Sequence, residues 1–107
     1  MKIWVDDVRP APEGYVWCKS VCDAIYEIEG GELYNWIDSN INNDTITLID
    51  IDHDAGEYAV YGGDYIKLLD WLEQTGRNYP IRIHSMNPVG VNNMRAIIKK
   101  NGWTEVK

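Results

Sequence analysis

The sequence predicts an α/β domain in which helices cover both faces of a parallel sheet. Short β-prone segments alternate with segments whose apolar residues recur at helical spacing, which is typical of parallel sheets. The length of 107 residues corresponds to a single domain, residues 1–107. Hydrophobic residues make up 45% and charged residues 25% of the chain, as in globular rather than disordered or fibrous proteins.

The first elements are two short strands and a helix. Residues 2–6 form an apolar strand that ends in acids, and two prolines and a glycine predict a loop over 7–14. Residues 15–18 are β-prone and form the second strand. A helix then begins at the N-cap candidate Ser20, and we expect the pair Gly30-Gly31 to end it. Its apolar face consists of Val21, Ala24, Ile25 and Ile28.

The stretch 32–43 is ambiguous, because Leu33, Trp36 and Ile37 allow one more short helix before the polar residues that follow. Residues 45–51 then form the clearest strand of the chain, and 52–63 form a loop. From Asp64 a second helix is expected, with Gly76 just past its end. Its apolar residues at helical spacing are Tyr65, Leu68, Leu69 and Leu72.

Three elements complete the predicted order β, β, α, β, α, β, α, β. Residues 81–84 form a strand, and a helix follows that Asn101-Gly102 close. Met94, Ile97 and Ile98 lie on one face of that helix. Residues 103–106 are expected to form a fifth strand.

Charge and composition exclude several classes of protein. Ten basic and seventeen acidic residues give a net charge of −7, which argues against a duplex nucleic-acid binder. No apolar run approaches the roughly 18 residues of a membrane helix, and acids stand where a signal peptide would be apolar, so we expect a cytoplasmic protein without membrane contact. Cys18 and Cys22 have no second cysteine pair, which excludes a four-cysteine zinc site.

Polar side chains follow three of the predicted strands where each strand ends. They are Asp6 and Asp7; Asp50, Asp52, His53 and Asp54; and His84, Ser85 and Asn87. Ligands of parallel sheets bind beyond the carboxyl ends of the strands. Clustered carboxylates repel one another unless a divalent cation lies among them or some are protonated. Their oxygens suit magnesium, calcium or manganese, although some of these acids could instead be helix caps or solvated loop residues.

The other polar residues at these strand ends suggest phosphate chemistry. His84 and His53 are candidate general acids or bases, although either could be an ordinary polar residue. Arg9 could bind a phosphate or serve as counter-charge to the neighbouring acids. Residues 87–93 open a helix, whose free N–H groups attract anions, and Gly90 would let a phosphate approach the backbone closely.

An acid pair after the first strand, an aspartate after the third and a serine after the fourth resemble receiver domains of response regulators. Here these residues are Asp6-Asp7, Asp50 or Asp52, and Ser85. The chain departs from that pattern at three places. No helix separates the first two strands, the final helix is missing, and only Glu105 and Lys107 stand near the place of the lysine that ends the last receiver strand.

A closer resemblance is to the cyclic-phosphate processing receiver domain family. The motifs that carry it are DDVRPAP at 6–12, DHD at 52–54 and HSMNPVGVNNM at 84–94, and they favour Asp52 over Asp50 as the receiver-like aspartate. The resemblance implies a flavodoxin-like, three-layer sandwich with a five-stranded, mainly parallel sheet in the order 2-1-3-4-5. The usual first and last receiver helices would be lacking.

The expected function is that of a metal-dependent phosphoesterase acting on a cyclic phosphate, either a cyclic nucleotide or a cyclic-phosphate nucleic-acid end. Magnesium or manganese would be held by Asp6, Asp7 and Asp52. His84 or His53 would protonate the leaving oxygen. Phosphate oxygens would be bound by Arg9, Ser85 and Asn87, with Gly90 beside them. The alternative is a non-catalytic module that binds a phosphorylated ligand or partner in the same pocket.

Overall fold

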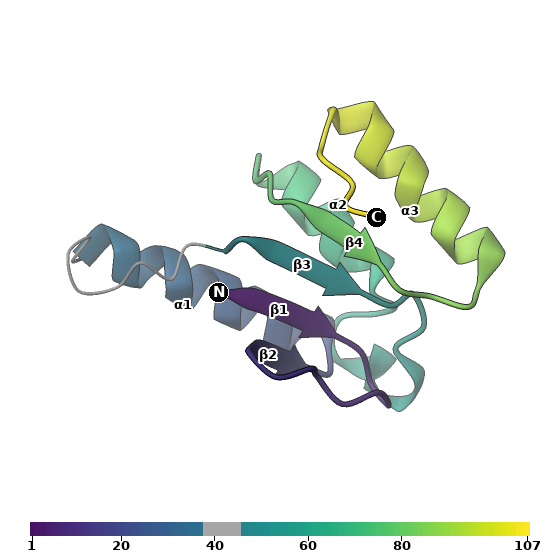
Figure 1. The fold of residues 1–107 in the computed structure, drawn as a ribbon, viewed down its shortest axis with the longest axis horizontal. Helices are drawn as coiled ribbons and strands as arrows, with labels where there is room; N and C mark the ends of the chain where they lie inside the picture. Colours follow the sequence, from purple (N-terminus) through teal and green to yellow (C-terminus); the bar gives the residue numbers. More distant parts are fainter. Residues whose placement is uncertain (38–45) are drawn as a thin grey trace.

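The computed structural model describes residues 1–37 and 46–107, with side chains described for 1–33 and 46–107 (Figure 1). The elements in chain order are β1 (Lys2–Val5), β2 (Tyr15–Cys18), α1 (Val21–Ile37), β3 (Leu48–Ile51), the 3-10 helix η1 (Gly56–Tyr61), α2 (Ile66–Gln74), β4 (Ile81–Ile83) and α3 (Pro88–Asn101). None of the helices in this part of the chain combines the length and apolar character that a membrane span requires.

The sheet has four parallel strands in the order β2-β1-β3-β4, which agrees with the predicted order up to its fourth member. The predicted fifth strand is wrong. The segment after α3 lies beside β4 but forms a single parallel bridge, Ile81 with Glu105. Two backbone hydrogen bonds join it to β4, and both involve Ile81. Val106 N–H donates to Ile81 O at 2.7 Å, and Ile81 N–H donates to Thr104 O at 3.0 Å. Pairing at one residue of β4 does not extend into a strand.

All three helices pack on the same face of the sheet. Side chains alternate along a strand, so the register places Ile3 and Val5 of β1 on the same face as Ile49 and Ile51 of β3. These four residues are fully buried in one core cluster with residues of α1, α2 and α3. Figure 1 shows α1 and α2 behind the sheet.

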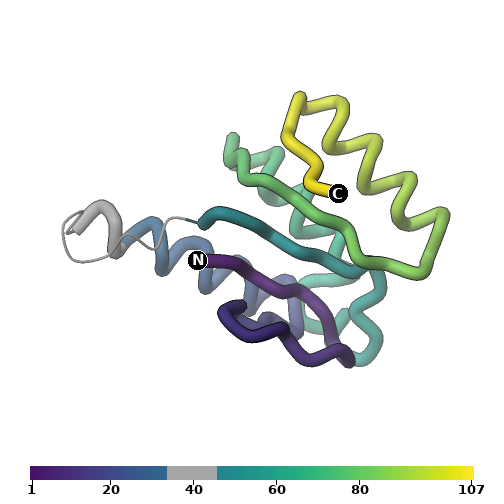
Figure 2. Tube along the Cα trace, in the orientation of Figure 1, coloured from purple at the N-terminus to yellow at the C-terminus, as the bar shows by residue number. Residues whose placement is uncertain are grey.

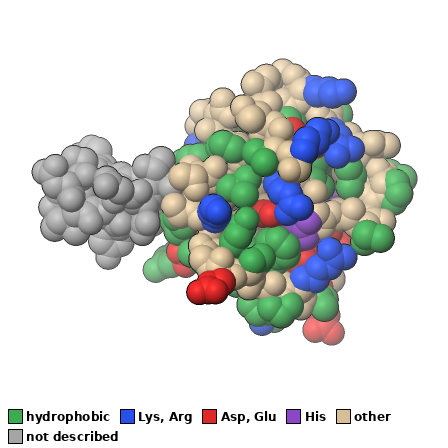
Figure 3. All heavy atoms as spheres, viewed as in Figure 1, with side chains coloured by type: hydrophobic (Ala, Val, Ile, Leu, Met, Phe, Trp, Pro, Cys, Tyr) green, Lys and Arg blue, Asp and Glu red, His purple; other side chains and the backbone are tan. Residues whose placement is uncertain are grey.

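The opposite face of the sheet has no helix on it within the described residues, so the predicted three-layer sandwich is wrong. The connection from β1 to β2 would be a helix in a receiver, but here it is an extended loop with Pro10 and Pro12 (Figure 2). That loop, unlike a helix, leaves the face uncovered. Figure 3 shows that apolar and basic side chains are mixed on the sheet face without a helix, although the net charge of the chain is −7.

Helix α1 runs through Gly30 and Gly31, where the sequence predicts its end. A tertiary contact supports the extra turns. Glu32, one residue further, accepts hydrogen bonds from Arg77 Nε at 2.8 Å and Nη2 at 2.9 Å and from the hydroxyl of Tyr79. Both partners lie in the connection between α2 and β4, so the contact overrides the low helix propensity of the glycines. The predicted short helix over 32–43 is merged into α1 up to Ile37, and its remainder lies outside the described residues.

We expect Glu32→Gln to lower the free energy of unfolding by about 1–2 kcal/mol, because it breaks a partly exposed charge-assisted pair. Arg77, above all, holds the pKa of Glu32 below its ordinary value of 4.5, against the opposing effect of burial and with help from Tyr79. A carboxylate whose folded pKa is lowered stabilises the fold above its unfolded pKa, and that contribution disappears as the pH falls through the folded value. Urea unfolding of both proteins at pH 7 and pH 3 should therefore show a smaller difference at pH 3. An equal difference at both pH values would contradict the assignment.

The remaining differences from the predicted elements are local. The strand predicted over 45–51 is described only as Leu48–Ile51, the loop 52–63 contains η1, and the helix expected from Asp64 begins at Ile66. The predicted caps are confirmed. Ser20 Oγ accepts from Asp23 N–H at 3.0 Å, and Gly102 ends α3 in the left-handed region with a φ of 67°.

Candidate functional site

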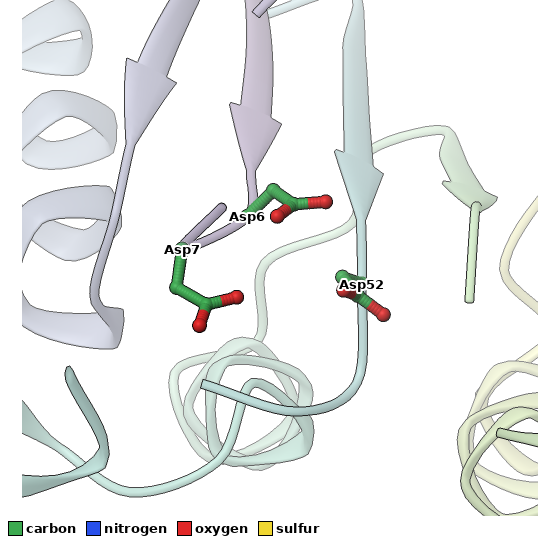
Figure 4. A group of neighbouring side chains, drawn as sticks. All are labelled: Asp6, Asp7 and Asp52. Carbon is green, nitrogen blue, oxygen red and sulfur yellow. The ribbon is translucent and has the colours of Figure 1, made fainter. Parts of the chain in front are cut away.

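Three carboxylates meet where β1 and β3 end (Figure 4). Asp6 and Asp7 follow β1 directly, and Asp52 follows β3 on the neighbouring strand. One ligand oxygen from each lies within 4.8 Å of the others. Asp6 is buried, and the other two are half-buried. This juxtaposition agrees with the predicted cation ligands, and an all-oxygen donor set fits magnesium or manganese. We call Asp6, Asp7 and Asp52 the acidic cluster.

Asp6 is held in a single orientation by three hydrogen bonds. Its Oδ1 accepts from the N–H groups of Val8 and Arg9, both at 2.9 Å, and its Oδ2 lies 2.9 Å from Nε2 of His84. Burial alone would raise the pKa of Asp6, but these hydrogen bonds outweigh burial and lower it. Asp6 is therefore ionised at neutral pH and carries the charge that a cation ligand needs.

The two other carboxylates are positioned by the backbone around them. A Cβ on Gly56 would lie 2.5 Å from Oδ2 of Asp7, and Gly56 has a φ of 56°, so only glycine gives Asp7 this place. Asp52 donates its N–H to Val5 O at 2.9 Å, which ties it to β1. Its Oδ1 accepts from the N–H of His53 at 2.7 Å. The 3-10 helix η1 and the end of β1 thus shape the cluster.

Tyr65 lies within the electrostatic field of the acidic cluster, and sequence reasoning assigned it only to the core. It is fully buried, and its hydroxyl donates to Lys19 O at 2.7 Å. Burial raises the pKa of Tyr65, and the nearby charges of Asp7, Asp6 and Asp52 raise it further. The hydroxyl therefore stays protonated and ties the start of α2 to the end of β2.

His84 has both ring nitrogens engaged by carboxylates. Nδ1 lies 2.6 Å from Oδ1 of Asp50, and Nε2 lies 2.9 Å from Oδ2 of Asp6. The imidazole therefore bridges the carboxylate of Asp50 and the carboxylate of Asp6. The ring also stacks on Trp4 with centroids 3.8 Å apart and planes at 6°, and its side chain is 7% exposed. Its predicted proton transfer to a substrate stays a prediction.

Asp50 lies on the uncovered sheet face, within β3, and is not a member of the acidic cluster. It is fully buried and bonds both His84 and Arg82, the latter at 2.9 Å from Oδ2. The structure thus answers which of Asp50 and Asp52 faces the cluster, in favour of Asp52. Position along the chain explains the choice, because Asp50 lies inside β3 whereas Asp52 follows the strand and reaches the edge of the sheet where β1 also ends.

His53 is oriented from two sides and is more accessible than His84. Its Nδ1 lies 2.8 Å from Oδ1 of Asp54, and its side chain is 15% exposed. A Cβ on Gly90 would lie 2.4 Å from Cγ of His53, so the missing side chain of Gly90 accommodates the imidazole. Within the described residues, Nε2 of His53 has no hydrogen-bond partner. Asp54 is 63% exposed and stands outside the acidic cluster.

The predicted phosphate-binding residues at the start of α3 serve as its cap in this structure. Asn87 Oδ1 accepts from Gly90 N–H at 3.1 Å, and Ser85 Oγ accepts from Asn87 N–H at 3.1 Å. The N–H of Gly90 is therefore already paired. The predicted contacts of Ser85, Asn87 and Gly90 with a phosphate stay predictions.

Arg9 contributes its backbone to the site and exposes its side chain. Its N–H binds Asp6, and its carbonyl accepts from Trp4 Nε1 at 2.8 Å. Across the described part of the chain the Arg9 guanidinium forms no ion pair, so it remains available to an anion. The alternative role as counter-charge to Asp6 or Asp7 is not seen.

Lys19 is a cation beside this site that sequence reasoning missed. It directly follows β2, and its ammonium lies 4.5 Å from the ring centroid of Trp17 and 6.0 Å from that of Tyr58. Trp17 Nε1 in turn donates to Asp6 O at 2.7 Å. Among the described residues Lys19 forms no ion pair. Its place after a strand was a usable signal, because every other strand end carried candidates.

Comparison with known proteins gives one match. The model of the family described as cyclic-phosphate processing receiver domain matches residues 1–100. No curated protein and no solved structure matches the chain.

Proposed function

The chain belongs to the cyclic-phosphate processing receiver domain family, and on this premise we propose that it is a metal-dependent phosphoesterase that opens a cyclic phosphate. The observation that carries the proposal is the acidic cluster, whose three ligand oxygens lie within 4.8 Å of one another. Three carboxylates at this separation repel one another, and a cation bound among them would remove that repulsion.

Asp6, Asp7 and Asp52 would hold the cation, magnesium or manganese. When bound there, such an ion would polarise a phosphoryl oxygen and would lower the pKa of a bound water. Hydrolysis of a cyclic phosphate adds a water molecule to phosphorus and breaks one of its two ester bonds. The leaving alkoxide oxygen takes up one proton, and the product is a phosphate monoester. The acidic cluster therefore needs a proton donor beside it.

His53 is the better proton donor of the two histidines. Nδ1 of His53 is anchored by Asp54, and Nε2 keeps no partner within the described chain. Both nitrogens of His84 are engaged by Asp6 and Asp50. A ring held at one nitrogen and open at the other is the arrangement that general acid catalysis uses. We therefore propose His53 as the acid.

The substrate in this proposal is a small phosphorylated molecule or a nucleotide, or a cyclic-phosphate nucleic-acid end. The cations that would bind its phosphate oxygens are Arg9 and Lys19, both without an ion pair in the described residues. Ser85 and Asn87 would add hydrogen bonds from the start of α3. The net charge of −7 disfavours duplex nucleic acid.

The test is a turnover screen of 2′,3′-cyclic nucleotides, 3′,5′-cyclic mono- and dinucleotides, and RNA with a 2′,3′-cyclic end. Each is assayed with magnesium, with manganese and with a chelator, and phosphate monoesters are detected. Turnover that the chelator abolishes supports the proposal. Saturable binding without turnover would favour the non-catalytic module, and neither binding nor turnover would reject both.

Replacement of Lys19 should weaken substrate binding. We expect Lys19→Met to raise KM about 10- to 100-fold, because a charge-assisted contact to phosphate is worth about 1.5–3 kcal/mol. Cation affinity should change little. Lys67→Met is the matched control, because Lys67 lies on α2 and its Nζ is already paired with Oδ2 of Asp70 at 3.8 Å. A KM that is equal in the two variants and in the wild type would remove Lys19 from the site.

A further inference from the structure

We propose that Asp50 is a positioning residue for the cation site, acting through His84 on Asp6. The inference rests on the proposed cation site and assigns a role to a carboxylate that lies outside the acidic cluster. Asp50, His84 and Asp6 form a continuous chain, with hydrogen bonds of 2.6 Å on one side of the imidazole and 2.9 Å on the other. The three residues come from β3, from the end of β4 and from the end of β1.

The orientation of Asp6 decides how it can bind a cation. A carboxylate offers about four acceptor positions. The N–H groups of Val8 and Arg9 use two positions on Oδ1, and His84 uses one on Oδ2. About one acceptor position is left, on Oδ2, so Asp6 would contact the ion through this single oxygen. Without His84 the carboxylate would keep only its Oδ1 bonds and could rotate its free oxygen away.

His84 in turn depends on Asp50 for its direction. The Trp4 indole, stacked at 3.8 Å, fixes the plane of the ring but allows it to turn within that plane. The bond to Asp50 stops this rotation and aims Nε2 at Asp6. Trp4 also donates its Nε1 to Arg9 O, and Arg9 N–H binds Asp6. The uncovered sheet face thus holds Asp6 by two routes.

The burial of Asp50 is difficult to explain by stability alone. The residue is fully buried, and its partner Arg82 is 45% exposed at the side chain. Buried carboxylates lose several kcal/mol of hydration, and replacing such an ion pair by apolar residues is often neutral or stabilising. A fold without this site could therefore carry an apolar residue at this position of β3. Hydrogen-bonded partners behind metal ligands usually contribute 10- to 100-fold in metal affinity.

The experiment measures the dissociation constant of Mn²⁺ alone by calorimetry, at a temperature well below unfolding. We expect Asp50→Asn to weaken binding about 10- to 100-fold. Arg82→Gln, which leaves Asp50 and His84 in place, should change binding less than about threefold. Ile51→Val, on the opposite face of β3, controls for a general loss of stability and should leave the constant unchanged.

A double-variant cycle tests the route through His84. If Asp50 acts through the imidazole, Asp50→Asn should have no further effect on Mn²⁺ binding in a His84→Gln background. Should Asp50→Asn not fold, His84→Gln alone must weaken binding at least about 10-fold. A wild-type protein that does not bind Mn²⁺ would overturn the proposed cation site. A wild type that binds, with Asp50→Asn or His84→Gln binding equally well, would overturn only the positioning role.

Discussion

Manganese or magnesium at about 100 times its dissociation constant should raise the unfolding temperature of this protein by about 10–20 °C. A ligand that binds only the folded state at this excess adds about 2.7 kcal/mol to stability. In a domain of this size, each kcal/mol corresponds to about 4–8 °C. The cation would also remove the mutual repulsion of Asp6, Asp7 and Asp52, whose ligand oxygens lie within 4.8 Å. Differential scanning fluorimetry with and without the ion measures the shift.

Asp7→Asn is the informative variant for this prediction. It removes one of the three charges, so the metal-free protein should unfold at the same or a higher temperature, while the shift on adding cation should largely disappear. Asp70→Asn, at a half-buried position of α2 outside the acidic cluster, is the matched control and should keep the full shift. A wild-type melting curve that is unchanged by either ion would remove the cation site from the mechanism.

The second large effect is expected on turnover. His53→Gln should lower kcat about 10²- to 10⁴-fold on whichever cyclic phosphate the screen identifies, because general acid catalysis is typically worth that factor. Cation binding should be retained, since His53 contacts the acidic cluster only through its N–H to Asp52, which a substitution keeps. Steady-state kinetics at saturating cation give kcat and KM separately.

His84 provides the contrasting variant. His84→Gln should raise the cation concentration needed for half-maximal turnover, and saturating cation should recover most of the activity. This difference follows from the geometry, because Nε2 of His84 contacts Asp6 whereas Nε2 of His53 has no partner in the described residues. If His84→Gln loses kcat at every cation concentration and His53→Gln does not, the two histidines exchange roles.

Most of the fold could be predicted because it depends on local periodicity. Short apolar or β-prone segments identify β1, β2, β3 and β4, and helical spacing identifies α2 and α3. Three predictions were wrong for reasons outside any local window. Helix α1 continues past its glycines because Glu32 meets Arg77, the fifth strand is only one bridge, and one sheet face has no helix in the described chain.

The order of the strands along the chain was enough to predict that Asp6, Asp7 and Asp52 lie together, because parallel strands present their carboxyl ends at one edge of a sheet. The contacts of the surrounding side chains, in contrast, depend on how distant elements pack together. His84 and Asp6 are 78 residues apart, and their hydrogen bond depends on a ring direction that Asp50 and Trp4 impose. The strand pattern places His84 at the end of a strand. The direction of its ring nitrogens, however, is set by packing between elements that are distant in sequence. For that reason the sequence alone could not distinguish a histidine available to substrate from one engaged by two carboxylates.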